Sequence, residues 1–184
     1  MRSPDFCPTR FRPGRRAFLA ALALAAAGCG DDRAGPRPGE VLPDLRLTGL
    51  DGSYLEMRSL RGRVLVLNAW ATWCPPCRRE MPALQRLSDA VQGKGVMVAG
   101  LTVDRDLNLV REFLLAHRIS FPQYVDPEMG LANGVLRVVG FPETFVVAPD
   151  GRLAARLVGE REWDGPDMIR SLEALARGER AGIR

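Results

Sequence analysis

The chain of 184 residues is poor in the side chains from which most metal centres are built. It has a single histidine, His117, and four cysteines, Cys7, Cys29, Cys74 and Cys77. A closed zinc site takes four ligands, mostly thiolates and imidazoles, and only two of these cysteines are neighbours in the sequence. His117 stands at the expected end of a helix, far from both. We therefore expect no metal site.

The chain also lacks an apolar run long enough to cross a membrane, which takes about 20 residues. The run at residues 17–27 follows five arginines and ends in small residues. That order is typical of a cleavable export signal, which we place at residues 1–28. Within it, Arg15-Arg16 followed by Ala17-Phe18-Leu19 resembles the twin-arginine export motif.

Without this segment the chain has no excess of charge of either sign. The first 28 residues hold five of the 26 basic side chains and one of the 22 acidic ones, so 21 of each remain. Binding to nucleic acid depends on a basic surface that neutralises phosphates. A domain with balanced charge is not of that class, and we expect no nucleic-acid partner.

The end of the signal resembles a lipobox, the bacterial site at which a cysteine is lipidated. It reads Ala26-Ala27-Gly28-Cys29, and the polar residues 29–40, rich in proline and glycine, are typical of a flexible linker. The folded domain would then occupy residues 41–184. Simple cleavage near Ala27, which leaves a soluble periplasmic protein, is the alternative. We expect a lipid anchor on Cys29, because an unpaired exposed thiol is rare in an exported protein.

Cys74 and Cys77 then remain as a C-x-x-C pair. The apolar residues 64–70 predict a buried strand, and a helix is expected over residues 75–91. Cys74 would stand at the N-terminus of that helix, where free N–H groups and the helix dipole stabilise a thiolate. We expect Cys74 to be the exposed nucleophile and Cys77 the resolving thiol of a redox-active disulfide, with no other cofactor. A structural disulfide is the alternative, but so small a loop constrains the unfolded chain weakly.

Residues 67–82, LNAWATWCPPCRREMP, resemble the extracytoplasmic thioredoxin-like proteins, the family that includes TlpA, ResA and the DsbE-type cytochrome c maturation reductases. Residues 140–145, GFPETF, are a second match, and the resemblance extends from about residue 43 to about residue 175. It implies a thiol-disulfide oxidoreductase that reduces oxidised cysteine pairs in client proteins. By resemblance the clients are apocytochromes c or copper-assembly factors of cytochrome oxidase. The electrons would come from a membrane thiol transporter of the DsbD/CcdA type, on the periplasmic face of the cytoplasmic membrane.

The pattern of elements predicts an α/β fold. It is the thioredoxin fold with an added N-terminal β-hairpin, in which helices flank a central mixed sheet. Strands are expected at residues 45–47, 53–55, 64–70, 96–103, 121–125, 144–148 and 153–158, and helices at residues 75–91, 107–116, 131–136 and about 168–175.

The resemblance also assigns roles around the cysteines. Glu80 would be a buried acid that handles protons during exchange, a task that thioredoxin gives to a strand position occupied here by Asn68. Pro142 would form a cis peptide with Phe141, whose backbone could then pair with an extended substrate. Trp73, Pro75 and Pro76 would contact the partner. Because neither proline supplies a charge or a side-chain donor, we expect a reducing couple.

Two alternatives belong to other classes. A peroxidase of the peroxiredoxin kind shares a related fold, but that family places Thr or Ser three residues before its reactive cysteine, where this chain has Ala71. A Cu(I)-binding module could use Cys74 and Cys77. Related copper carriers have a wider C-x-x-x-C spacing and a suitable histidine, which His117 is not.

Overall fold

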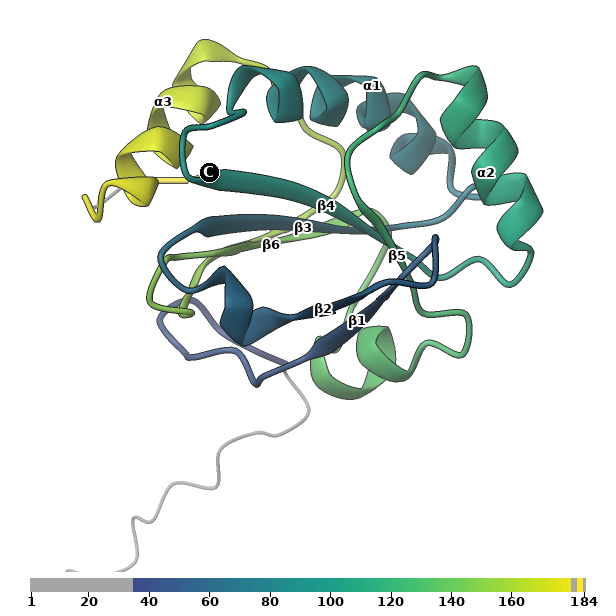
Figure 1. Cartoon of the computed structure of the whole chain (residues 1–184), viewed down its shortest axis with the longest axis horizontal. Coiled ribbons are helices and arrows are strands. Elements are labelled where there is room, and N and C mark those ends of the chain that lie inside the picture. Colours follow the sequence, from purple (N-terminus) through teal and green to yellow (C-terminus); the bar gives the residue numbers. More distant parts are fainter. Residues whose placement is uncertain (1–34, 180–181, 184) are drawn as a thin grey trace, which may run out of the picture. The chain divides into compact units, whose positions relative to one another are not determined.

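The computed structural model describes residues 35–179 together with residues 182 and 183. The predicted export signal at residues 1–28, the lipid site Cys29 and the linker residues 29–34 lie outside the described residues. Figure 1 shows the described part as a twisted sheet with helices packed against it. In this part of the chain no helix is both long enough and apolar enough to cross a membrane.

The central strand is β3 (Val64–Trp70), as predicted, and all seven of its residues are buried. It pairs in parallel with β4 (Val96–Thr102) and antiparallel with β6 (Glu143–Val147). A strand covered on both faces and both edges tolerates a continuous apolar run. Asn68 is the polar exception in this run, and its register partner on β6 is Thr144.

The strand order in the sheet is β2-β1-β5-β4-β3-β6-β7. The outer strands are β1 (Arg46–Gly49), β2 (Tyr54–Glu56), β5 (Gln123–Val125) and β7 (Leu153–Val158). β4 pairs in parallel with β5, whereas the β1–β2, β1–β5 and β6–β7 pairs are antiparallel. The sheet is therefore mixed, and the predicted N-terminal hairpin extends it beyond β5.

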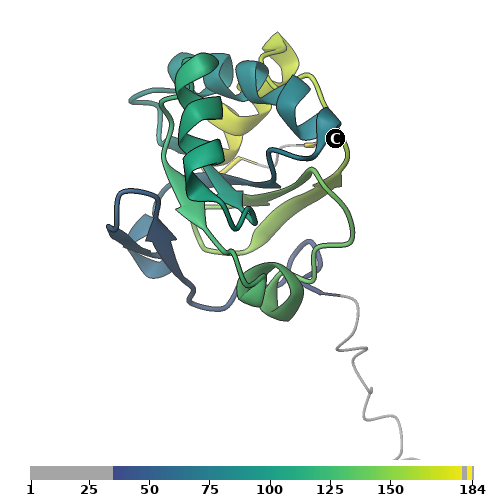
Figure 2. The same ribbon diagram turned by 90° about the vertical axis from the view of Figure 1, so that its right-hand side faces the viewer.

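Three helices cover one face of the sheet: α1 (Pro75–Ala90), α2 (Leu107–Ala116) and α3 (Pro166–Ala176) (Figure 2). Val64, Val66 and Trp70 of β3 point into the core beneath them. These are the alternate residues of the strand, which a pleated strand turns to the same face. Asn68 shares that parity, so its side chain also points toward the helices.

The opposite face of the sheet has a second core. There Leu65 and Leu67 of β3 pack with residues of the N-terminal hairpin and of the short helix η1 (Met57–Leu60). The π-helix η2 (Gly130–Val135) closes the same face, one residue earlier than the helix predicted at residues 131–136. The two cores together fix β3 from both sides, and with it the segment that leads to Cys74.

The folded part includes residues just before the predicted domain start at Val41. Gly39 N–H donates to the Leu153 carbonyl at 2.7 Å, and Leu153 N–H donates to the Glu40 carbonyl at 2.8 Å. The last residues of the predicted linker therefore lie against β7.

Gly100 on β4 lies so close to the Gln123 side chain that no larger residue fits at this position without a shift. A Cβ atom there would meet the Gln123 Oε1 at 2.0 Å. Gln123 is buried and is held by two hydrogen bonds: its Oε1 accepts from Trp70 Nε1 at 3.0 Å, and its Nε2 donates to the Phe121 carbonyl at 3.2 Å. Gly100→Ala should lower the free energy of unfolding by about 1–3 kcal/mol, the usual range for overpacking.

Urea denaturation of the variant measures this effect. Gly134→Ala is the control, since nothing lies within 4 Å of a Cβ at that glycine. Equal stability of the two alanine variants would show that Gln123 moves aside freely and that its contact with Trp70 contributes little.

Candidate active site

Cys74 and Cys77 form a disulfide that closes the first turn of α1. Cys74 is the N-cap residue with an extended backbone, and its Sγ accepts from Cys77 N–H at 3.3 Å. Pro75 and Pro76 occupy the first two helical positions, where the missing N–H groups would have no partner within the helix. The remaining free N–H groups and the positive end of the helix dipole thus act on the Cys74 sulfur.

The prediction that Cys74 is exposed is wrong for this oxidised state. Cys74 is 4% exposed and Cys77 is fully buried. The reason is the N-cap geometry, which turns the Cys74 sulfur back over the first turn of α1 toward Cys77 N–H. Trp73, by contrast, is 61% exposed beside the disulfide, as its predicted contact with partners requires.

The loop at residues 139–142 lies next to the cysteine motif. The ring of Trp73 meets the ring of Phe141 edge to face, with centroids 5.7 Å apart. The Phe141–Pro142 peptide is cis, which confirms the prediction. Val139, at the start of this loop, is 71% exposed. Trp73 and Val139 therefore expose apolar side chains, and the partly buried Phe141 packs against Trp73.

A buried ion pair that the sequence analysis missed holds this loop. Glu143, fully buried, accepts from the guanidinium of Arg156 through Oε1 and from Val139 N–H through Oε2 at 2.8 Å. Arg156 Nη2 also donates to the Arg137 carbonyl at 2.6 Å. Removal of one member of a buried pair commonly costs about 3–5 kcal/mol, because the other charge is left without a partner. The pair thus keeps residues 137–142 in one conformation.

The sequence also provided no indication of a second supporting carboxylate, that of Asp104, which holds the turn before Cys74. Asp104, just after β4, accepts from Thr72 N–H at 2.8 Å and from the Thr72 hydroxyl at 2.6 Å. The Thr102 hydroxyl donates to the same carboxylate at 2.7 Å. Since Thr72 lies two residues before Cys74, Asp104 fixes the turn from which the nucleophile projects.

Glu80 lies on α1, one turn after Cys77, and is 2% exposed. Three donors from two parts of the chain, β3 and the loop that joins β7 to α3, hold its carboxyl. Asn68 Nδ2 on β3 donates to Oε1 at 2.7 Å. Trp163 Nε1 donates to Oε2 at 3.0 Å, and Arg161 N–H donates to the same oxygen at 3.2 Å. Glu80 is thus buried, as the prediction of its role requires.

Burial raises the pKa of Glu80, and this effect exceeds the opposing effect of its three hydrogen bonds. The nearby charge of Glu160 raises the same pKa further. A carboxyl whose pKa is moved toward neutrality can take up and release a proton under ordinary conditions.

The Asn68 amide suits either protonation state of Glu80. Its Nδ2 donates to Glu80 and, at 2.9 Å, to the Thr144 hydroxyl oxygen, which leaves its buried Oδ1 without a partner. A half-turn of the amide would exchange the two atoms. Oδ1 would then accept a hydrogen bond from a protonated Glu80.

Trp163 is the site residue that the sequence concealed most completely. It lies in the loop between β7 and α3, is fully buried, and reaches Glu80 across 83 positions of sequence. The only signal was a tryptophan among charged residues, outside any apolar run. His117, by contrast, is an exposed residue at the end of α2, where its ring stacks on Phe113 with centroids 4.4 Å apart.

No group of three or more His, Cys, Asp or Glu side chains is arranged to hold a metal ion within the described residues.

Known proteins resemble this chain over most of its folded part. The sequence model described as the AhpC/TSA family matches residues 38–156. The thiol-disulfide oxidoreductase ResA of Bacillus cereus is 31% identical over 123 residues, which cover 67% of this chain and 70% of that protein. The thioredoxin-like protein YneN of Bacillus subtilis is 32% identical over 119 residues, which cover 64% of this chain and 69% of that protein.

Two solved structures have a similar fold. The secreted thiol-disulfide isomerase of Corynebacterium glutamicum has a TM-score of 0.66 at 26% identity, covering 74% of this chain and 85% of that chain. A thiol:disulfide interchange protein of the thioredoxin family from Chlorobium tepidum has a TM-score of 0.61 at 25% identity, covering 80% of this chain and all of that chain. The predicted thioredoxin fold is confirmed.

Because Glu80 is buried, the free energy of unfolding should depend on pH. Because its folded pKa is raised, the folded state holds a proton that the unfolded state has lost. The stability of the wild type should therefore fall as the pH rises from about 4.3, the unfolded value, through the raised pKa. Glu80→Gln should abolish this fall, and the variant should be the more stable at neutral pH by about 1.4 kcal/mol for each unit of the shift. Asn68 can rotate to offer Oδ1 to the new amide.

Chemical denaturation of the oxidised proteins at a series of pH values tests this. Glu112→Gln, at an exposed position on α2, controls for the loss of one negative charge. A Glu80→Gln variant that is less stable than the wild type from pH 5 to pH 9 would mean that Glu80 is held as a paired carboxylate with a lowered pKa.

Proposed function

Because the chain belongs to the AhpC/TSA family of thioredoxin-like proteins and is a thiol-disulfide oxidoreductase of the ResA type, we propose that it reduces disulfides in client proteins outside the cytoplasm. The observation that carries this proposal is the pairing of the Cys74–Cys77 disulfide with the buried acid Glu80 on the same helix. In its reduced dithiol form the cysteine pair provides the electrons, and Glu80 provides the proton transfer.

In the proposed reaction the reduced enzyme attacks through the Cys74 thiolate. The Cys74 Sγ forms a bond to one client sulfur, and the client disulfide breaks. The second client sulfur leaves as a thiolate and takes a proton from solvent. The Cys77 sulfur then attacks the Cys74 Sγ, and the mixed disulfide breaks. The first client sulfur leaves as a thiolate and also takes a proton from solvent, so the client leaves as a dithiol. Two electrons have passed to the client, and the enzyme returns to the Cys74–Cys77 disulfide seen in this structure.

Glu80 acts in the second step. Cys77 is fully buried, and burial in apolar surroundings disfavours a thiolate. A Glu80 carboxylate that takes the Cys77 proton lets the sulfur attack as a thiolate. When the enzyme is reduced again, the same carboxyl returns the proton. Its raised pKa suits it to both directions of this transfer.

The surface around the disulfide fits an extended client segment. The exposed ring of Trp73 and the partly buried ring of Phe141 offer apolar contact, and Pro75 and Pro76 follow at the start of α1. Next to cis-Pro142, the Phe141 backbone has no hydrogen-bond partner among the described residues. It is therefore free to pair with the backbone of a client, as in strand addition.

The proposed clients are oxidised cysteine pairs in apocytochromes c or in copper-assembly factors of cytochrome oxidase. The proposed electron donor is a membrane thiol transporter of the DsbD/CcdA type. The export signal and the lipobox-like Cys29 support a place on the periplasmic face of the membrane. One structural relative is itself named a secreted protein.

The alternatives have less support. In a peroxidase of the peroxiredoxin kind, the position three residues before the nucleophile would be Thr or Ser, but here it is Ala71, which is fully buried and has no polar side chain for a peroxide. In a copper-binding module, Cys74 and Cys77 would need a third ligand nearby. His117 is instead stacked on Phe113 at the end of α2.

A trapping experiment tests the proposed function. Purified Cys77→Ser, once reduced, should form a stable mixed disulfide with an oxidised C-x-x-C-H peptide, the haem-attachment sequence. Cys74→Ser, which keeps the buried thiol, is the matched control and should form none. An oxidised C-x-x-x-C peptide run in parallel distinguishes a copper-assembly client from a cytochrome client. The proposal fails if neither peptide is trapped, or if Cys74→Ser traps them equally.

The proposed lipid anchor on Cys29 can be tested separately. Mass spectrometry of the mature protein should find an acylated N-terminal Cys29, and Cys29→Ala should move the protein from the membrane fraction to the soluble periplasm. Single acyl chains bind membranes only marginally, so the expected mass is that of more than one chain. An unmodified Cys29, or equal membrane association of the two proteins, would refute the anchor.

A further inference from the structure

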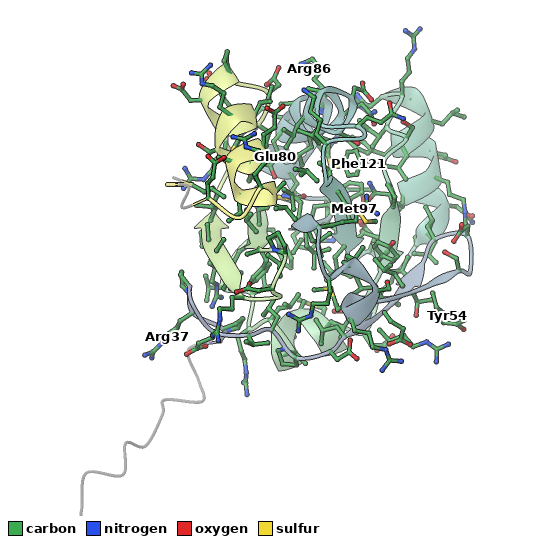
Figure 3. The ribbon with its side chains drawn as sticks, turned by 60° about the vertical axis from the view of Figure 1, so that its left-hand side comes forward. Arg37, Tyr54, Glu80, Arg86, Met97 and Phe121 are labelled. Atoms are coloured by element: carbon green, nitrogen blue, oxygen red, sulfur yellow. A yellow bond between two sulfur atoms is a disulfide. The ribbon has the colours of Figure 1, made fainter. Side chains whose placement is uncertain are left out.

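Glu80 forms part of the wall of a pocket of about 450 Å³. The pocket lies between α1 and the loop that joins β7 to α3, and Figure 3 shows Glu80 and Arg86 on the side of α1 that faces α3. The other walls are strongly polar: Arg79, Arg86, Glu160, Arg161, Glu162 and Asp164. A polar pocket of this size has room for water, on the order of ten molecules at about 30 Å³ each.

Two ion pairs join α1 to the loop at this pocket. Arg79 Nη2 lies 2.6 Å from Glu160 Oε2, and Arg79 Nε donates to the same carboxylate at 2.9 Å. Arg86 Nε lies 2.6 Å from Asp164 Oδ2. The loop segment between the two acids contains Arg161 N–H, a donor to Glu80, so the ion pairs hold that donor in place.

The charged groups that face Glu80 all come from this side. α1 contributes Arg79 and Arg86, and the loop contributes three acids together with Arg161. On the sheet side Glu80 meets the neutral Asn68, and Thr144 lies behind it. Trp163, fully buried, donates to the carboxyl through Nε1, and Cys77, also fully buried, lies one turn earlier on α1.

A proton carried by Glu80 needs a route to solvent. Under the proposed function, Glu80 takes a proton from Cys77 and gives one back in each cycle, yet the residue is 2% exposed. Proton transfer needs a hydrogen-bonded contact, directly or through water. The pocket is a polar space with room for water that extends to Glu80, and its walls include neither Trp73 nor Phe141.

We propose that this pocket is the port through which Glu80 exchanges protons with solvent, with Glu160 as the relay at its mouth. The proton passes from Cys77 Sγ to the Glu80 carboxylate, from there to pocket water, and then to the Glu160 carboxylate or to bulk solvent. In the reverse half of the cycle it returns by the same path. A client bound over Trp73 and Phe141 would therefore leave the proton path open. This inference rests on the proton-transfer role proposed for Glu80.

Chemical rescue tests the port. Glu80→Ala leaves a hole that formate, the smallest carboxylic acid, can fill. Reduced Glu80→Ala should reduce an oxidised peptide about 100-fold more slowly than the wild type in stopped-flow measurements, and formate should restore at least tenfold of this loss. Adding Ala83→Leu, which places bulk in the wall of the pocket, should cancel most of the rescue. Ala90→Leu, at the far end of α1, is the matched control and should leave the rescue intact.

A second variant needs no change in the core. Glu160→Gln on the otherwise unchanged chain should slow the resolution step severalfold in dilute buffer, and a high concentration of a small buffer should restore it. Glu173→Gln breaks the Lys94–Glu173 ion pair of 2.8 Å, which also involves α3, and should do neither. If Ala83→Leu does not fold, the comparison of Glu160→Gln with Glu173→Gln still tests the proton port.

The outcomes separate the two proposals. If Glu80→Ala is as fast as the wild type, the proton-transfer role of Glu80 is wrong, and the port falls with it. If Glu80→Ala is slow but formate gives no rescue, or if the rescue persists with Ala83→Leu, Glu80 keeps its role and the port is wrong. The port is equally wrong if Glu160→Gln behaves like Glu173→Gln.

Discussion

The burial of one carboxyl group, that of Glu80, is the constraint on which the active site depends. A charge removed from water is costly unless it is hydrogen-bonded, and here the chain supplies donors from β3, from Trp163 and from the backbone of Arg161. These donors compensate the burial only in part, so the pKa of Glu80 stays raised. An acid that was fully compensated would remain ionised and could not exchange a proton.

The same arrangement explains the shape of the surrounding structure. α1 carries the cysteines at its N-terminus and Glu80 one turn further on, so a single rigid helix sets the order nucleophile, resolving thiol and acid. Carboxylates from other elements hold the neighbouring loops: Asp104 holds the turn before Cys74, and Glu143 with Arg156 holds the loop before cis-Pro142. These supporting residues keep the cysteines and Glu80 in position but take no part in the proposed exchange reaction.

The sequence predicted the parts of the site that are local. A C-x-x-C pair between an apolar strand and a helix places Cys74 at a helix N-terminus, and the family motifs indicated Glu80 and cis-Pro142. The parts that it concealed are contacts between distant positions: Asn68 with Thr144, Glu80 with Trp163, and Thr72 with Asp104 are separated by 76, 83 and 32 residues. Nothing in the local pattern of Asp104 or Trp163 distinguishes a partner of the site from an ordinary loop residue. The prediction that Cys74 is exposed was wrong because the C-x-x-C spacing does not show which way the Cys74 sulfur points. In the structure the N-cap geometry turns this sulfur inward, toward Cys77 N–H.

Carbon NMR of the Glu80 side-chain carboxyl, titrated against pH in the oxidised and the reduced protein, tests the central claim most directly. The burial of Glu80 predicts a pKa clearly above the ordinary value of about 4.3 in the oxidised protein. The proposed proton transfer also predicts a different pKa for Glu80 in the reduced protein, where the proposed proton donor Cys77 is a free thiol. A carboxyl that titrates at the ordinary value in both states would contradict the account, because such a group would be ionised throughout and would have no proton to give back to Cys77.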